Sequence, residues 1–197
     1  MTATPQTRAV ALVLSGLLGL GVTACSQDPE RARADETPRA SLTVHEAPTL
    51  ESLGVVRLGT VRGRLPKRDR ERLLEQVSHT VDQWLRGAYL EGDYPRNDFR
   101  AGFAAFTPGA RRQARADKKL LSNAGARITA VRPRARRLAV DAVAVRGRAV
   151  GATARVRLVF DASGKQDRTV IVRGRVFLTR TKQGWQIFGY DVSRGTA

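Results

Sequence analysis

Residues 126–160, ARITAVRPRARRLAVDAVAVRGRAVGATARVRLVF, predict a β-sheet because apolar side chains recur at about every second position. This period is typical of β-strands with one buried and one exposed face. The pattern continues beyond residue 160, and we expect strands near 126–132, 137–146, 149–161, 168–180 and 184–193. Short turn-forming segments separate them, which favours an antiparallel sheet of about five strands.

The hairpin registers predict which residues share the buried face of this sheet. Pairing Val156 with Val172, Val140 with Ala154 and Val176 with Phe188 gives one consistent apolar face. Its members are Leu138, Val140, Ala142, Val150, Ala152, Ala154, Val156, Leu158, Val170, Val172, Val176, Phe188, Tyr190 and Val192. We expect helices to cover this face.

The opposite face of the sheet is predicted to be mixed. In these registers Arg155 faces Arg173, and Asp141 and Asp191 are placed to separate the arginines. One interpretation is a solvated charged face. The other is a partner or self-association surface, which would also permit a homodimer; its residues are Arg155, Arg173, Arg175, Phe177, Trp185 and Ile187. A third is that residues 50–65 cover the apolar part.

The helices are predicted upstream of the strands. A helix begins near Pro66 and carries an apolar stripe at spacings of three and four residues, from Leu73 to Ala88. A short second helix contains Phe99, Phe103 and Phe106, and a third begins at Thr107-Pro108 and runs to Leu121. Helices followed by a strand meander indicate an α+β fold, with N-terminal helices packed on one face of a curved antiparallel sheet, over residues 66–197.

The N-terminal residues resemble a bacterial lipoprotein signal. One positive charge (Arg8), an apolar run from Ala9 to Val22 and small residues precede Cys25, the single cysteine of the chain. A membrane-spanning helix needs about 20 apolar residues, and this run is shorter. We therefore expect residues 1–24 to be removed, Cys25 to be lipidated, and the protein to lie on the extracytoplasmic face of the cell membrane. Residues 25–49 are interpreted as a disordered tether, and residues 50–65 as an arm or short strand.

Composition limits the partners. The chain of 197 residues carries a formal net charge of +17, which favours attraction to anionic phospholipid or an anionic wall polymer. Another envelope protein, docking on the mixed sheet face, is a further candidate partner. Arginine enrichment can also reflect a GC-rich genome. Nucleic acid binding is not expected for an exported chain without an aromatic-basic recognition motif.

Two short motifs resemble a known family. The segment Phe106-Thr107-Pro108-Gly109-Ala110 and the final strand Gly184-Trp185-Gln186-Ile187-Phe188-Gly189-Tyr190-Asp191-Val192, in this element order, are similar to the nuclear-transport-factor-2-like cone fold, which includes actinobacterial envelope proteins. The resemblance implies a pocket between sheet and helices. Its candidate lining residues are Trp84, Tyr89, Tyr94, Phe103, Phe188 and Tyr190.

The catalytic expectation is negative. Enzymes of this fold place an acid, a base or a His–Asp pair in the pocket, whereas the predicted pocket face here offers only the Tyr190 hydroxyl. His79 should face water, His45 lies in the tether, and no motif for a metal or cofactor is found. We expect a non-catalytic binding or accessory module, without catalytic residue, metal or cofactor. The alternative is an isomerase- or cyclase-type enzyme with its pocket inside the cone.

Overall fold

The computed structural model describes residues 53–197, and these form an α+β structure. The interpretations of residues 1–24, of the tether at 25–49 and of Cys25 and His45 concern positions outside this range. The elements, in chain order, are β1 (Gly54–Arg62), α1 (Lys67–Leu85), the π-helical turn η1 (Arg86–Leu90), the 3-10 helix η2 (Arg100–Ala105), α2 (Pro108–Ala116), α3 (Lys118–Leu121), β2 (Ile128–Val145), β3 (Arg148–Gly164), β4 (Arg168–Thr181) and β5 (Gly184–Thr196).

The sheet has five strands in sequence order, and it is mixed rather than purely antiparallel. β1 pairs in parallel with β2, and the other neighbours are antiparallel. The predicted arm at 50–65 therefore supplies an edge strand, while the strands predicted at 126–132 and 137–146 are one strand, β2. Pro133 does not end β2 because it lies at a register shift in the ladder, where a missing N–H is tolerated.

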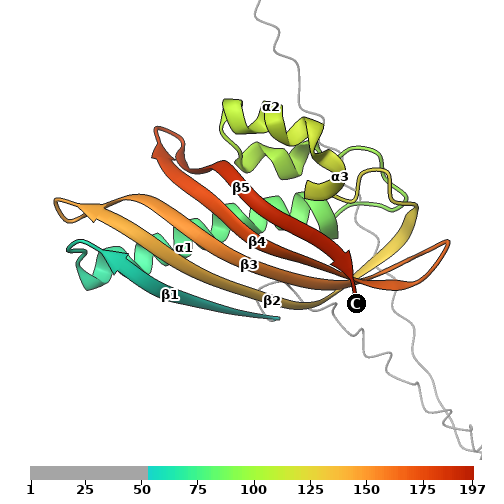
Figure 1. Cartoon of the computed structure of the whole chain (residues 1–197), viewed down its shortest axis with the longest axis horizontal. Coiled ribbons are helices and arrows are strands. Elements are labelled where there is room, and N and C mark those ends of the chain that lie inside the picture. Colours follow the sequence, from blue (N-terminus) through green and yellow to red (C-terminus); the bar gives the residue numbers. More distant parts are fainter. Residues whose placement is uncertain (1–52) are drawn as a thin grey trace, which may run out of the picture. The chain divides into compact units, whose positions relative to one another are not determined.

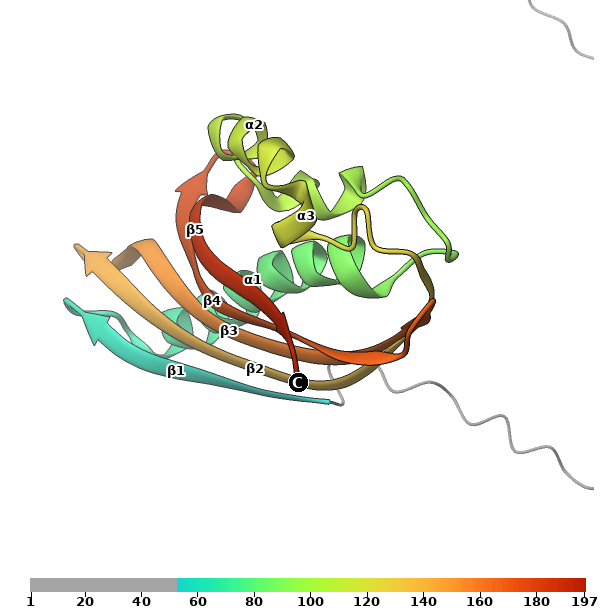
Figure 2. The ribbon, with the colours of Figure 1, turned by 45° about the vertical axis from the view of Figure 1, so that its right-hand side comes forward.

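The helix α1 begins where the sequence predicts, directly after Pro66, and buries the expected stripe. Leu73, Val77 and Val81 are buried, and the stripe continues through Trp84 and Leu85. In Figures 1 and 2, α1 lies against one face of the sheet, which curves around it. We call this the inner face and the opposite one the outer face.

The helices after α1 follow the prediction with one difference. Thr107 caps α2 by accepting a hydrogen bond from the Ala110 N–H at 3.4 Å, as its position before Pro108 indicates. The predicted third helix is divided at Asp117 into α2 and α3. η1 and η2 approach closely at Gly87 and Gly102, where neither residue has a side chain. A Cβ on Gly102 would stand only 2.7 Å from the Ala88 backbone nitrogen, so a larger residue would not fit.

The inner face contains most of the predicted apolar residues even though two registers differ from the expected ones. Leu158, not Val156, pairs with Val172, and Tyr190, not Phe188, pairs with Val176. A shift of two residues preserves the face of each side chain, because the side-chain period of a strand is two. Val140 pairs with Ala154 as predicted.

Two bulges move residues to the other face. Phe177 pairs with Gly189 and Leu178 with Ile187, so that Phe188 is the extra residue of β5. The predictions for three side chains are therefore wrong: Phe188 is 53% exposed, whereas Trp185 and Ile187 are buried at 6% and 0%. Val150, next to the shift between Val143 and Ala144, is likewise exposed.

Candidate functional site

The residues predicted to line a pocket inside the domain are mostly packed core. Trp84 and Tyr89 are fully buried, and Phe103 is 7% exposed. Their rings form a contact chain with Phe106, with centroids 5.9 Å apart for Trp84 and Tyr89, 6.1 Å for Trp84 and Phe106, and 5.7 Å for Phe103 and Phe106. These separations are typical of packed edge-to-face aromatic pairs, so side chains fill the region where a pocket was predicted.

The tyrosines of the predicted pocket are bound to the segment 117–123. The Tyr89 hydroxyl donates to the Leu120 carbonyl at 2.7 Å, and the Tyr190 hydroxyl donates to the Asp117 carboxylate at 2.6 Å. The Tyr94 hydroxyl accepts a hydrogen bond from the Asn123 side-chain amide at 2.9 Å and donates to the Tyr89 carbonyl at 2.8 Å. Burial raises the pKa of all three hydroxyls, and for Tyr190 the Asp117 carboxylate raises the pKa further. These hydroxyls stay protonated at neutral pH and hold the fold together.

One buried carboxylate was not foreseen. Asp82 on α1 forms an ion pair with Arg136 on β2, with 2.6 Å between Nη2 and Oδ2, and their side chains are 10% and 2% exposed. Ser78 accepts a second hydrogen bond from the same nitrogen at 2.7 Å. Arg136 shares strand parity with Leu138, which is the signal that places it inward. His79 is exposed, as predicted.

The outer face carries three arginines in line. Arg137 pairs with Arg157, and Arg157 pairs with Arg173, so the three side chains stand side by side on β2, β3 and β4. All three are exposed. No carboxylate lies within 4.0 Å of them among residues 53–197. We call these three residues the arginine row.

A second line of arginines, two residues along each strand, is neutralised. Arg155 pairs with Arg175 across the strands, not with Arg173 as expected. Arg155 forms an ion pair with Asp141, and Arg175 with Asp191, each at 2.5 Å. Asp141 and Asp191, which were predicted to separate the arginines, therefore neutralise this second line. Within residues 53–197, the arginine row has no such carboxylate.

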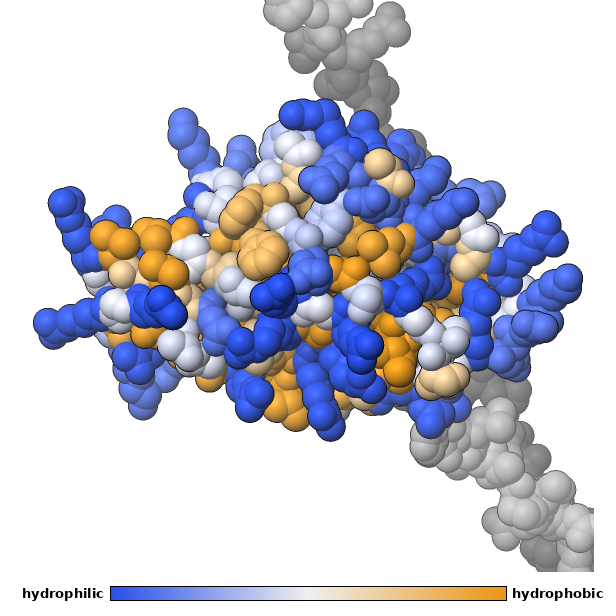
Figure 3. Space-filling view, in the orientation of Figure 1, coloured by the Kyte–Doolittle hydropathy of each residue, from blue (hydrophilic) through white to orange (hydrophobic). Residues whose placement is uncertain are grey.

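The same face has an apolar end near the β2–β3 hairpin. Val143, Val145 and Val150 are exposed by 47%, 52% and 46%. Phe188 contacts the half-buried Phe177 nearby, with ring centroids 6.3 Å apart. Figure 3 shows hydrophobic side chains at this end of the molecule, and a mixture of hydrophilic side chains and further hydrophobic patches over the rest of the visible face. We call Val143, Val145, Val150 and Phe188 the apolar end.

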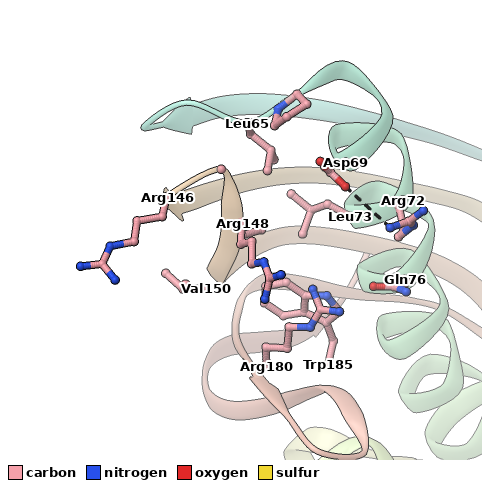
Figure 4. Close-up of a pocket in the computed structure, with 13 residues that line it drawn as sticks. Leu65, Asp69, Arg72, Leu73, Gln76, Arg146, Arg148, Val150, Arg180 and Trp185 are labelled. Atoms are coloured by element: carbon pink, nitrogen blue, oxygen red, sulfur yellow. Dashed lines mark ion pairs between the residues drawn. The ribbon is translucent and has the colours of Figure 1, made fainter.

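On the helix side, a groove of about 880 Å³ lies between the start of α1 and the β2–β3 and β4–β5 hairpins. Leu65, Leu73, Ala149 and Trp185 give it apolar walls. Figure 4 shows the side chains of Arg72, Arg148 and Arg180 around it, whereas Arg146 points away. We call this cavity the hairpin groove. The hairpin groove could not be predicted from local sequence patterns, because its residues come from three distant segments.

In residues 53–197, no three His, Cys, Asp or Glu side chains are grouped so that they could hold a metal ion. Within the same range, no helix is both long and apolar enough to cross a membrane.

Comparisons of the chain with protein-family models, with curated proteins and with solved structures found no match.

Proposed function

We propose that the protein is a membrane-anchored, non-catalytic module of the cell envelope that docks its outer sheet face on anionic phospholipid. The observation that carries this proposal is the arginine row, in which three cations lie side by side without a carboxylate among the described residues.

The arginine row costs stability in the isolated protein. Like charges on directly opposed residues are destabilising. At about 5 Å in water, each adjacent pair repels by roughly 0.8 kcal/mol, although the long side chains can splay apart. An anionic surface removes this repulsion and adds attraction of about 1 kcal/mol per arginine. The feature is therefore unfavourable alone and favourable on a negatively charged surface.

The apolar end favours a bilayer over a purely polar polyanion. The side chains of the apolar end lie on the outer face, as the arginine row does, or at the tip of the β2–β3 hairpin. Proteins that bind the membrane interface combine basic residues, which contact headgroups, with apolar ones that enter the acyl boundary. Figure 3 shows both kinds of surface on one side of the molecule.

The packing of the domain interior supports a non-catalytic role. Trp84, Tyr89 and Phe103 fill the region where a catalytic pocket was the alternative. The buried Asp82 carboxylate is held by Arg136 between α1 and the sheet. We therefore favour a binding or accessory module over an isomerase- or cyclase-type enzyme.

Lipidation of Cys25 and membership of the cone-fold family are parts of the same proposal. The order of helices and strands and the curvature of the sheet around α1 support the cone fold. Cell fractionation tests the anchor. The Cys25→Ser chain should leave the membrane fraction or remain unprocessed, and an unchanged distribution with normal processing would contradict lipidation.

Vesicle co-sedimentation tests the docking surface. The full chain carrying Cys25→Ser, which lacks acyl groups, is mixed with phosphatidylglycerol or phosphatidylcholine vesicles. We expect binding to phosphatidylglycerol only, decreasing as salt rises. Changing Arg137, Arg157 and Arg173 together to Gln should weaken binding by roughly 150-fold, since about 3 kcal/mol is lost.

A matched variant separates the surface from net charge. Arg68, Arg112 and Arg115 are exposed on helices, and changing them to Gln lowers the net charge by three, as the change in the arginine row does. This control should reduce binding far less than the variant of the arginine row. Equal losses would contradict a defined docking face. The proposed partner would be wrong if the chain did not bind vesicles but bound an anionic wall polymer or another protein. It would also be wrong if the outer face proved to be the interface of a homodimer.

A further inference from the structure

We infer that the hairpin groove is a binding site for a phosphate group, either inorganic phosphate or the phosphate of a small organic molecule. The site is distinct from the arginine row, because Arg180 pairs with the buried Trp185 and the groove lies on the α1 side of the sheet; Val150, at the hairpin tip, borders both the groove and the apolar end. It would give the module a soluble or lipid-derived ligand in addition to its surface.

The charge of the hairpin groove comes from separate elements. Arg72 is on α1, Arg148 begins β3 and Arg180 is near the end of β4. No carboxylate lies within 4.0 Å of Arg148 or Arg180 in residues 53–197, and Arg72 has only a long contact with Asp69, at 3.7 Å. Figure 4 shows Arg148 and Arg180 on the strand side of the groove, near Trp185, and Arg72 on the α1 side.

A phosphate fits this arrangement better than a carboxylate does. A guanidinium donates two parallel hydrogen bonds to an oxyanion, and a phosphate monoester offers three terminal oxygens and up to two charges. Three arginines arriving from different directions can therefore each reach a separate oxygen. The groove wall also includes the Asp69 carboxylate in the first turn of α1, which pairs with Arg72 and offsets the positive potential of the helix start, so Arg148 and Arg180 are the arginines most available to a phosphate.

Trp185 is the second feature that points to a ligand. Its side chain is 6% exposed and forms part of the groove wall. Its indole N–H is buried and has no hydrogen-bond acceptor among the described residues. A buried donor without an acceptor costs about 1–3 kcal/mol. An oxyanion in the groove could supply that acceptor after a small side-chain movement.

The volume of the groove indicates more than a bare ion. Small-molecule sites usually measure about 300–1,000 Å³, and the groove has about 880 Å³. Leu65 and Leu73 give an apolar contact area beside the arginines. The groove therefore has room for a phosphate attached to a small organic group.

NMR spectroscopy of the full chain carrying Cys25→Ser tests the inference. The chain has two tryptophans, and the Trp84 indole N–H already donates to the Leu121 carbonyl at 3.2 Å. Titration with inorganic phosphate at constant ionic strength should shift the Trp185 indole signal and leave that of Trp84 in place. Trp185→Phe assigns the signal. Acetate serves as the carboxylate comparison and should bind more weakly.

Substitutions locate the site. Arg148→Gln and Arg180→Gln should each weaken phosphate binding about tenfold or more, because each removes charge-assisted hydrogen bonds. Arg146→Asn removes a neighbouring charge whose side chain points away, and Arg173→Gln removes one from the arginine row. Both controls should change affinity less than about twofold. Their amide spectra report whether each variant is folded.

Further ligands distinguish the source of the phosphate. Glycerol 3-phosphate represents a soluble ester, and dihexanoyl phosphatidic acid represents a lipid headgroup. Tighter binding of either than of inorganic phosphate supports the site and names its source. The inference is overturned if no ligand shifts the Trp185 signal at concentrations well above about 1 mM, or if Arg146→Asn weakens binding as much as Arg180→Gln. Such a failure leaves vesicle binding by the arginine row unaffected.

Discussion

The buried ion pair between Asp82 and Arg136 gives the sharpest stability prediction. Asp82→Asn keeps the size of the side chain but removes its charge, which leaves the Arg136 guanidinium buried at 2% exposure with Ser78 as its other acceptor. Removing one partner of a buried pair costs about 3–5 kcal/mol because the remaining ion is neither hydrated nor neutralised. For a domain of this size, the melting temperature should fall by about 6–20 °C.

Urea unfolding followed by circular dichroism measures this loss as a shift of the midpoint with an unchanged slope. Asp191→Asn is the matched control, because its partner Arg175 is on the surface and both side chains are more than half exposed. The control should cost less than about 1 kcal/mol. The double variant Asp82→Leu with Arg136→Met should recover most of the loss, since no unpaired charge remains. If Asp82→Asn costs no more than Asp191→Asn, the buried pair between Asp82 and Arg136 does not stabilise the fold.

Three further predictions concern the fold. The pKa of all three tyrosines is higher in the folded than in the unfolded chain, so the unfolded chain loses these protons at lower pH. The free energy of unfolding should therefore be constant below about pH 10 and fall above it. Tyrosinate absorbance should appear only as the chain unfolds. Gly102→Ala should cost about 1–3 kcal/mol in urea unfolding because its Cβ would meet the Ala88 backbone, whereas Gly109→Ala, with nothing within 4 Å, should change stability little. Arg146→Asn should raise the free energy of unfolding by up to ~1 kcal/mol, and with it the melting temperature. Arg146 has a φ of 49° in the hairpin turn, and asparagine tolerates this conformation better than arginine does.

Local patterns were enough to predict much of the fold. The alternation in 126–160 gives the strands and their inner face, and the stripe from Leu73 to Ala88 gives α1. Thr107-Pro108 gives the start of α2. These features depend on neighbours within a few residues, so the sequence contains the whole signal. A register shift of two residues did not affect them, because it leaves the side-chain face unchanged.

The candidate sites could not be predicted in the same way. A single bulge residue, Phe188, places Trp185 and Ile187 in the core and reverses the face predicted for all three. No local pattern marks this bulge, because it depends on how β4 and β5 pair along their whole length. The aromatic residues chosen as pocket lining fill the interior instead, and burial of this kind is a property of packing between elements.

Residue type and short spacing were enough to predict most of the helices and strands, most of the inner apolar face and the excess of positive charge. Only the tertiary structure decided which arginines have partners: Asp141 and Asp191 neutralise Arg155 and Arg175, while the arginine row is left without a carboxylate in the described region. It also decided that α1 and two hairpins enclose a groove. Ion pairs and cavities depend on distances of a few ångströms between segments far apart in the chain, and only folding sets those distances.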